Sequence, residues 1–203
     1  MVYIVLPTGL HAEYAIKAAE AGKHVWCEKP MARTVNECQQ IIDACDRNKV
    51  KLSIGYRMQH EPNTQTIMKW ASEQPYGQIK RLSAEAGYYG GRINQWKLTE
   101  SMGGGAIYDM GVYPINGLRY ATGLEPLAVK EARHVTTRPK IFTEVDETTY
   151  FTLEFPGDIT AQGATSFGHN WNKMHVDCDN GWYELSPFQS YSGIQGTTSD
   201  GLV

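Results

Sequence analysis

The chain has 203 residues, of which 41% are hydrophobic, and its formal net charge at pH 7 is −3. This length and composition allow one large or two small domains with a sizeable core, and they exclude wholesale disorder. The lack of a basic surplus argues against nucleic acid as the main partner, and no apolar run is long enough to span a membrane.

The first quarter of the chain alternates short apolar strands with helices. We predict strands at residues 2–6, 23–28 and 50–56. Helices are predicted between them, at residues 11–22 and 34–49. Thr34 and Glu37 have the spacing of a capping box that opens the second helix. Strand–helix alternation with short connections implies parallel βαβ units with right-handed crossovers.

Long strands replace this alternation near residue 57, where we place a domain boundary. A helix is expected at residues 63–73 and another at about 105–121. Strands are expected at residues 79–90, 127–137, 147–155, 159–167, 174–179 and 182–186. Apolar and polar side chains alternate over residues 150–155, so that strand has two different faces. We therefore predict an α+β layer on a mostly antiparallel sheet.

The predicted first sheet is typical of the later strands of a doubly wound nucleotide-binding fold. Such folds carry a G-x-G-x-x-G fingerprint in their first strand–helix turn. No such sequence follows a strand here, and the three glycines at residues 103–105 lack the spacing. Either the fold never had the fingerprint, or the chain is a fragment that lacks its first βα units.

The triplet Glu28-Lys29-Pro30 ends the second strand with two opposite charges. Ligands of open α/β sheets bind beyond the carboxyl ends of the strands, which is where this triplet lies. Pro30 keeps Lys29 extended, and a cis peptide bond there would turn the lysine side chain into a cleft. A lysine in such a cleft can exchange protons. The alternative is an exposed charge pair followed by a turn proline.

Three further segments contain candidate ligand contacts. His11 ends the segment "PTGLH", whose strand is expected to lie beside that of Lys29. The three glycines at 103–105 leave bare backbone N–H groups at the start of a helix, where a polar ligand can bind. Asp109 and Tyr113 are four residues apart and are predicted to share a helix face, so the carboxylate can hold a proton-transferring phenol. Each of these segments is also compatible with a purely structural role.

The remaining histidines and the cysteines are predicted to be structural. The five histidines other than His11 are scattered along the chain. The four cysteines contain no C-x-x-C pair, so we expect free thiols and no metal site. Trp96 beside Lys97 is either an aromatic platform with a cation or a core residue next to a surface residue.

Several segments together resemble the Gfo/Idh/MocA oxidoreductases, and especially the glucose–fructose oxidoreductase branch. "LPTGLHAEYAIKAAEAGKHVWCEKPMA" resembles the second nucleotide-domain segment of the family, with its Glu-Lys-Pro signature. "GYRMQHEP" resembles the entry to the substrate domain. The segments that resemble the branch lie at residues 96–126, 142–168 and 181–193. The resemblance runs essentially from end to end.

The resemblance implies a partial Rossmann domain at residues 1–57 and a truncated substrate and oligomerisation domain with an open, mostly antiparallel sheet at residues 58–203. It implies NADP or NAD as cofactor, and hydride transfer between the nicotinamide and a carbon of a small sugar or polyol. Lys29 would be catalytic and Pro30 a cis-proline, with Asp109 and Tyr113 matching the family's Asp-x-x-x-His/Tyr pair. The residues expected along the cofactor are Pro7, Leu10, His11, Glu28, Lys29, Arg57, Trp96 and Lys97. Lysine at position 97, where the family has arginine, loses the bidentate fork.

The resemblance leaves several alternatives open. Rival functions are an NAD-dependent glycosidase on the same scaffold, a non-catalytic binding protein, and a structural subunit assembled through the antiparallel sheet. A homo-oligomeric enzyme fits the two-faced strands equally well. The compartment stays open between cytoplasm and periplasm, because an export signal would precede Met1.

Overall fold

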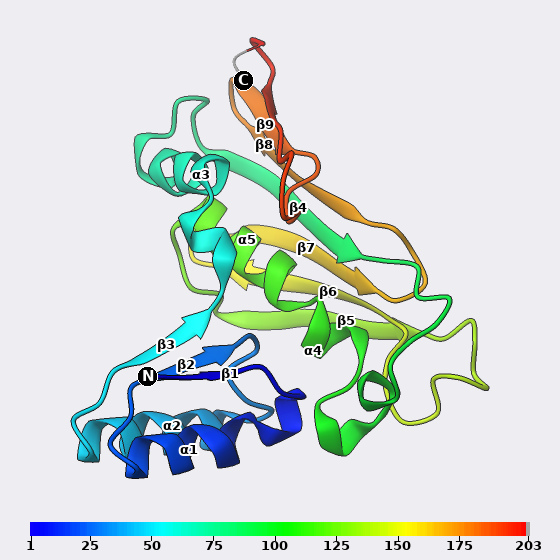
Figure 1. The fold of residues 1–203 in the computed structure, drawn as a ribbon. Coiled ribbons are helices and arrows are strands. Elements are labelled where there is room, and N and C mark those ends of the chain that lie inside the picture. Colours follow the sequence, from blue (N-terminus) through cyan, green and yellow to red (C-terminus); the bar gives the residue numbers. More distant parts are fainter. Residues whose placement is uncertain (202–203) are drawn as a thin grey trace.

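Two β-sheets divide the chain in the structure, a computed structural model that describes residues 1–201 (Figure 1). The first sheet is parallel and has the order β1-β2-β3. Its strands are β1 (Val2–Ile4), β2 (Val25–Glu28) and β3 (Leu52–Gly55). The helices α1 (His11–Glu20) and α2 (Val35–Arg47) connect these strands, as the alternation of the sequence predicted.

Helices α1 and α2 cover one face of the parallel sheet, and Figure 1 shows them side by side beneath it. Ala15, Ala19 and Ile41 are fully buried because they lie on the helix faces that meet the sheet. Ile4 and Cys27 reach them from the strands and complete a core of their own. The first sheet therefore has its own core, beside the larger one of the second sheet.

The predicted capping box opens α2. The Thr34 side chain accepts a hydrogen bond from the backbone N–H of Glu37 at 3.1 Å, and the Glu37 carboxylate accepts one from the backbone N–H of Thr34 at 3.1 Å. We expect Thr34→Ala to lower the free energy of unfolding by about 1 kcal/mol in urea titrations followed by circular dichroism. The control is Val35→Ala, because the Val35 side chain is 87% exposed. Equal free energies of unfolding for the two variants would contradict the cap.

The second sheet has seven strands in the order β10-β9-β8-β4-β7-β6-β5. Only the β4–β7 pair is parallel, and its other pairs are antiparallel. The strands are β4 (Ile79–Gly87), β5 (Ala128–Val135), β6 (Thr148–Phe155), β7 (Ile159–Ser166), β8 (Asn172–Cys178), β9 (Gly181–Leu185) and β10 (Gly196–Thr198). This mixed sheet beside a parallel sheet confirms the predicted fold class.

Helix α5 (Val112–Thr122) packs on one face of the second sheet, and α3 (Pro62–Glu73) packs against α5 (Figure 1). Phe155 of that face is fully buried, whereas Gln162 and Arg133 are exposed. The sheet therefore has one covered and one open face. No helix within residues 1–201 is long and apolar enough to cross a bilayer.

The helix predicted at about 105–121 is two helices in the structure. Helix α4 (Ala106–Asp109) ends at Asp109, and α5 begins at Val112. Pro114 has no backbone N–H to donate, so it fits the first turn of a new helix and not the interior of a continuous one. Strand β10 was not predicted, because three residues with no apolar alternation carry no strand signal.

Candidate active site

A cavity of about 400 Å³ lies where the parallel sheet faces the second sheet. Tyr3, Trp26 and Glu28 line it from β1 and β2. Arg57 lines it from the short helix η2 (Arg57–His60), and Tyr113 from α5. The cavity therefore extends over the uncovered face of the parallel sheet to the carboxyl ends of its strands, where ligands of open α/β sheets bind.

Lys29 enters this cavity directly after β2. The Lys29–Pro30 peptide bond is cis, as the family resemblance implied. The Lys29 ammonium donates a hydrogen bond to the backbone carbonyl of Asp109 at 2.5 Å and one to its carboxylate at 3.4 Å. These contacts place the last residue of α4 against the end of β2, 80 residues apart in the chain.

Asp109 lies between two lysines. Its second carboxylate oxygen accepts hydrogen bonds from Lys97 at 2.6 Å and from the Tyr88 hydroxyl at 3.5 Å. The side chains of Lys29, Lys97 and Asp109 are 17%, 19% and 15% exposed. Burial opposes ionisation of Asp109, but Lys29 and Lys97 together hold the pKa of its carboxyl below the usual value. Two ammonium groups around one carboxylate leave a surplus positive charge at the cavity wall.

Tyr113 lies beside Lys29 in the cavity lining. Its ring centroid is 4.9 Å from the Lys29 ammonium nitrogen and 5.7 Å from the guanidinium carbon of Arg57. The side chain is buried, and burial raises the pKa of the phenol, while the Arg57 charge opposes that shift. The hydroxyl is therefore protonated through the neutral range, so Tyr113 can donate a proton to a ligand oxygen.

The expected pairing of Asp109 with Tyr113 is not what the structure shows. Within residues 1–201, the side-chain hydrogen bonds of the Asp109 carboxylate come from Lys29, Lys97 and Tyr88. The helix break at Met110 separates the two residues, so the four-residue spacing does not bring them onto one helix face. Asp109 therefore fixes Lys29 and not Tyr113.

The three glycines before α4 do not leave free N–H groups for a ligand. Their N–H groups donate to the carbonyls of Glu100, Thr99 and Lys97 at 2.9, 3.1 and 2.9 Å. Gly105 has a φ of 103°, and a Cβ there would lie 2.2 Å from the Asp146 carboxylate, which accepts from the N–H of Ile107. The glycines thus permit a tight turn that presents Asp109, which favours the structural alternative over a ligand-binding turn.

His11 joins two loops and does not face the cavity. Its ring nitrogens are each 2.8 Å from a backbone carbonyl oxygen, one of Leu6 and one of Pro30, and the side chain is 1% exposed. Pro7 and Leu10 lie in the same strand–helix loop, outside the cavity lining of the part of the chain that the structure describes. The loop thus supports the segment that presents Lys29.

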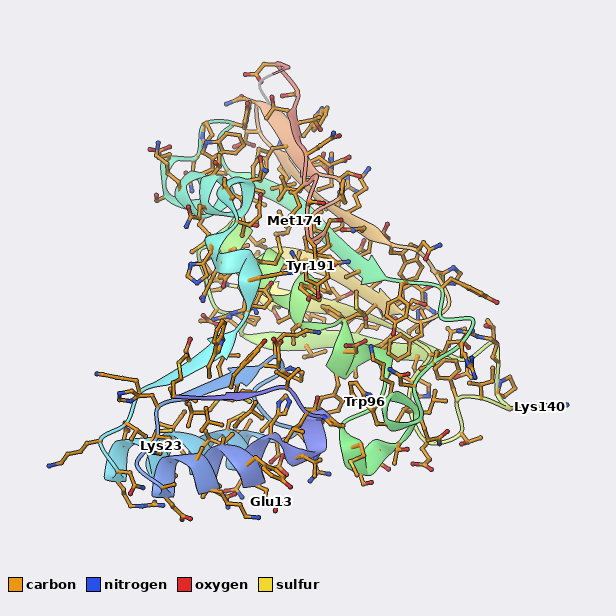
Figure 2. The ribbon with its side chains drawn as sticks, in the orientation of Figure 1. Glu13, Lys23, Trp96, Lys140, Met174 and Tyr191 are labelled. Carbon is orange, nitrogen blue, oxygen red and sulfur yellow. The ribbon has the colours of Figure 1, made fainter. Side chains whose placement is uncertain are left out.

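Trp96 and Lys97 lie in the short helix η3 (Gln95–Leu98). Lys97 belongs to the charge cluster, and its ammonium nitrogen is 5.4 Å from the centroid of the Trp96 ring. Figure 2 shows Trp96 in the loop region between β4 and α4, away from Tyr191. Neither residue lines the cavity in the described chain, and Lys97 is connected to the site through the Asp109 carboxylate.

The cavity also contains residues that the sequence did not single out. Tyr3 and Trp26 are stacked with ring centroids 4.5 Å apart, and the Tyr3 hydroxyl donates to the Glu28 carboxylate. His60, predicted to be structural, and Tyr191 line the cavity as well. The sequence gives one signal for Tyr3 and Trp26. Both are large aromatic residues at strand positions on the sheet face that the helices do not cover. The four cysteines are free thiols.

Comparison with known proteins matches the chain to two models of one family. Residues 1–56 match "Oxidoreductase family, NAD-binding Rossmann fold", and residues 64–184 match "GFO/IDH/MocA C-terminal domain". D-xylose 1-dehydrogenase [NADP(+)] of Haloarcula marismortui is 33% identical over 173 residues, which are 79% of this chain and 46% of that protein. The chain therefore spans about half the length of this relative.

A solved structure is more similar still. The aldose–aldose oxidoreductase from Caulobacter crescentus, complexed with glycerol, superposes with a TM-score of 0.93 and is 36% identical. The match covers 99% of this chain and 61% of that one. A scyllo-inositol 2-dehydrogenase (NADP(+)) of Bacillus subtilis is 31% identical over 130 residues, which are 64% of this chain and 36% of that protein.

Proposed function

The chain belongs to the Gfo/Idh/MocA family of oxidoreductases, and on that premise we propose that its cavity transfers a hydride between a sugar or polyol carbon and NADP or NAD. The observation that carries the proposal is the position of Lys29. Its ammonium is fixed by Asp109 and lies 4.9 Å from the Tyr113 ring, in a cavity at the carboxyl ends of parallel strands. A fixed cation next to a protonated phenol suits the oxygen of a carbonyl that becomes an alcohol.

The cavity residues fit the nicotinamide end of such a cofactor. Tyr3 and Trp26 provide aromatic surface, and the Glu28 carboxylate provides acceptors for hydroxyl groups. The cofactor, when bound, supplies or accepts the hydride. Among the described residues, no glycine fingerprint follows a strand, so this part of the chain offers no fit to the pyrophosphate.

Lys29 and Tyr113 divide the work at the reacting oxygen. The Lys29 ammonium donates a hydrogen bond to that oxygen, and the surplus positive charge of the lysine–aspartate cluster stabilises the negative charge that develops there. Tyr113 donates its proton to the oxygen in the reductive direction and regains it in the oxidative direction. Asp109 orients Lys29, and Lys97 contributes positive charge from the other side of the Asp109 carboxylate.

The domain boundary and the assembly belong to the same proposal. We place the boundary near residue 57, between β3 and η2, consistent with family matches that end at residue 56 and resume at residue 64. We place a homo-oligomer contact on the open face of the second sheet. That face is hollowed by about 430 Å³, and Glu131, Arg133 and Gln162 stand on it. Light scattering of a Gln162→Arg variant tests the contact.

The decisive experiment is a spectrum of the protein expressed from its complete gene. Absorbance is recorded with NADP and with NAD, before and after a panel of aldoses, ketoses and polyols is added. A reduced-nicotinamide band that one sugar produces supports the proposal. No band with any member of the panel, or sugar release without a net change in cofactor, would contradict it.

Tyr113→Phe is expected to lower kcat by about 10²-fold and to leave KM within about threefold, because only the proton-transferring hydroxyl is removed. In the reductive direction, the rate of the parent protein holds through neutral pH and falls only above about pH 10, since burial raises the pKa of Tyr113. The variant loses this alkaline limb. Tyr120→Phe is the matched control, since Tyr120 lies on the same helix outside the cavity lining in residues 1–201. A parental pH profile in Tyr113→Phe would refute the assignment.

A further inference from the structure

Tyr191 presents an almost free aromatic ring at the mouth of the cavity. Its side chain is 93% exposed, yet it lines the cavity together with Lys29 and Tyr113. It also lines an adjoining hollow of about 380 Å³, which shares Arg57 and His60 with the cavity. Figure 2 shows Tyr191 in the middle of the molecule, between the parallel sheet and the β8–β9 hairpin. Single exposed apolar residues are common on protein surfaces, so the exposure alone decides nothing.

The backbone that carries Tyr191 is held from two sides. The Asn172 side-chain oxygen accepts the N–H groups of Phe188 and Gln189, each at 2.9 Å. The Asn172 side-chain nitrogen donates to the Ser190 hydroxyl at 3.1 Å. The Arg57 guanidinium donates to the backbone carbonyls of Gln189 and Ser190. An exposed ring on so firmly bonded a segment is held ready for contact, unlike a ring at a frayed loop tip.

Arg57 also fixes the ring itself. Its guanidinium carbon lies 4.4 Å from the Tyr191 ring centroid and 5.7 Å from that of Tyr113. A guanidinium at the face of an aromatic ring is attracted by the ring's electrons. One face of Tyr191 is therefore backed by a cation that also touches the proton-donating tyrosine, and the rest of the ring stays open to solvent.

We propose that Tyr191 is the platform on which the ring of the sugar stacks, so that it determines how the sugar is presented to Lys29 and Tyr113. Sugars and cyclic polyols have C–H faces that suit an aromatic ring and hydroxyl edges that suit polar groups. Tyr191 follows β9 and lines the cavity from the side of the second sheet. Cofactors of parallel sheets bind at the carboxyl ends of the parallel strands, which lie on the other side of the cavity. The molecule that touches Tyr191 is therefore the substrate. This inference rests on the proposed function and deepens it.

The kinetic test is Tyr191→Ala in the protein expressed from its complete gene. KM for the reactive sugar is expected to rise about tenfold, at the top of the range for a stacked pair, with kcat within about twofold. Tyr191→Phe keeps the platform and the parental KM. Tyr14→Ala, which removes an exposed tyrosine from α1, is the control. An unchanged KM in Tyr191→Ala, or a fall in kcat alone, overturns the platform.

A binding test separates this inference from the proposed function. The protein is labelled with fluorotyrosine, and the Tyr191 resonance is identified by its loss in Tyr191→Phe. A shift on adding D-glucose, D-xylose or myo-inositol without cofactor supports the platform, even if no hydride transfer is found. A shift with NADP and with none of the three sugars assigns the ring to the cofactor and overturns the platform. Turnover of a sugar together with a parental KM in Tyr191→Ala leaves the proposed function standing and removes the platform.

Discussion

Lys29→Met is expected to lower kcat for sugar oxidation by about 10²- to 10³-fold, the range for the loss of one donor to an oxygen that develops negative charge, with the cofactor dissociation constant within about threefold. Methionine keeps the length of the side chain and removes the ammonium. The hydrogen bonds to the Asp109 carbonyl and carboxylate are lost together with the donor to the reacting oxygen. Stopped-flow absorbance of the first turnover measures the loss directly.

Lys97→Met is the matched control for this result. Both lysines bond the Asp109 carboxylate, but only Lys29 lines the cavity in the described chain. Removing Lys97 takes one positive charge from behind the site, so a loss of about tenfold or less is expected. If both variants lose activity equally, Lys29 acts through the charge of the cluster and not at the reacting oxygen.

The position of Lys29 was predictable because its signals are local. A short apolar run that ends in Glu28, Lys29 and Pro30 specifies a strand and a polar turn within a few residues. Helix α2 was predictable for the same reason, since its capping box spans four residues. The carboxyl ends of adjacent parallel strands share one edge, so the place of the cavity followed from the strand order.

The partners of Asp109 were not predictable in this way. Lys29 and Lys97 are 80 and 12 residues away from it, and no periodicity links such distances. The four-residue spacing to Tyr113 suggested a helix pair instead, and Pro114 broke the helix that the pair required. In sequence, the glycines at 103–105 resemble a ligand-binding loop. Their N–H groups donate to backbone carbonyls, which every residue has, so the sequence does not reveal that these donors are occupied.

Tyr191 was missed for a related reason. It stands in the irregular segment after β9, where neither helical nor strand periodicity marks a face. Its neighbour Arg57 was expected along the cofactor, and it does line the cavity. The structure adds that the guanidinium is occupied by the carbonyls of Gln189 and Ser190. Contacts between an irregular segment and a residue far away in the chain can be identified only in the folded structure.

Asp109→Asn is expected to lower the free energy of unfolding by about 2–4 kcal/mol, because it leaves two partly buried ammonium groups without a counter-charge. This expected loss is smaller than that for a fully buried ion pair, because the three side chains remain 15% to 19% exposed. Urea unfolding at neutral pH measures the loss. Activity falls as well, because the amide no longer holds Lys29 by charge.

The double variant Asp109→Asn/Lys97→Met decides whether charge is the cause. Removing the second ammonium relieves the repulsion, so the double variant is expected to be more stable than Asp109→Asn alone. The pH dependence gives an independent check. Lys29 and Lys97 hold the folded-state pKa of Asp109 below its usual value, so its stabilisation is complete above about pH 4 and is lost as pH falls through the folded-state pKa. This loss of stability at acid pH should be missing in Asp109→Asn. If it persists there unchanged, and the double variant is no more stable than Asp109→Asn, then the packing of the asparagine and not the lost charge destabilises the protein.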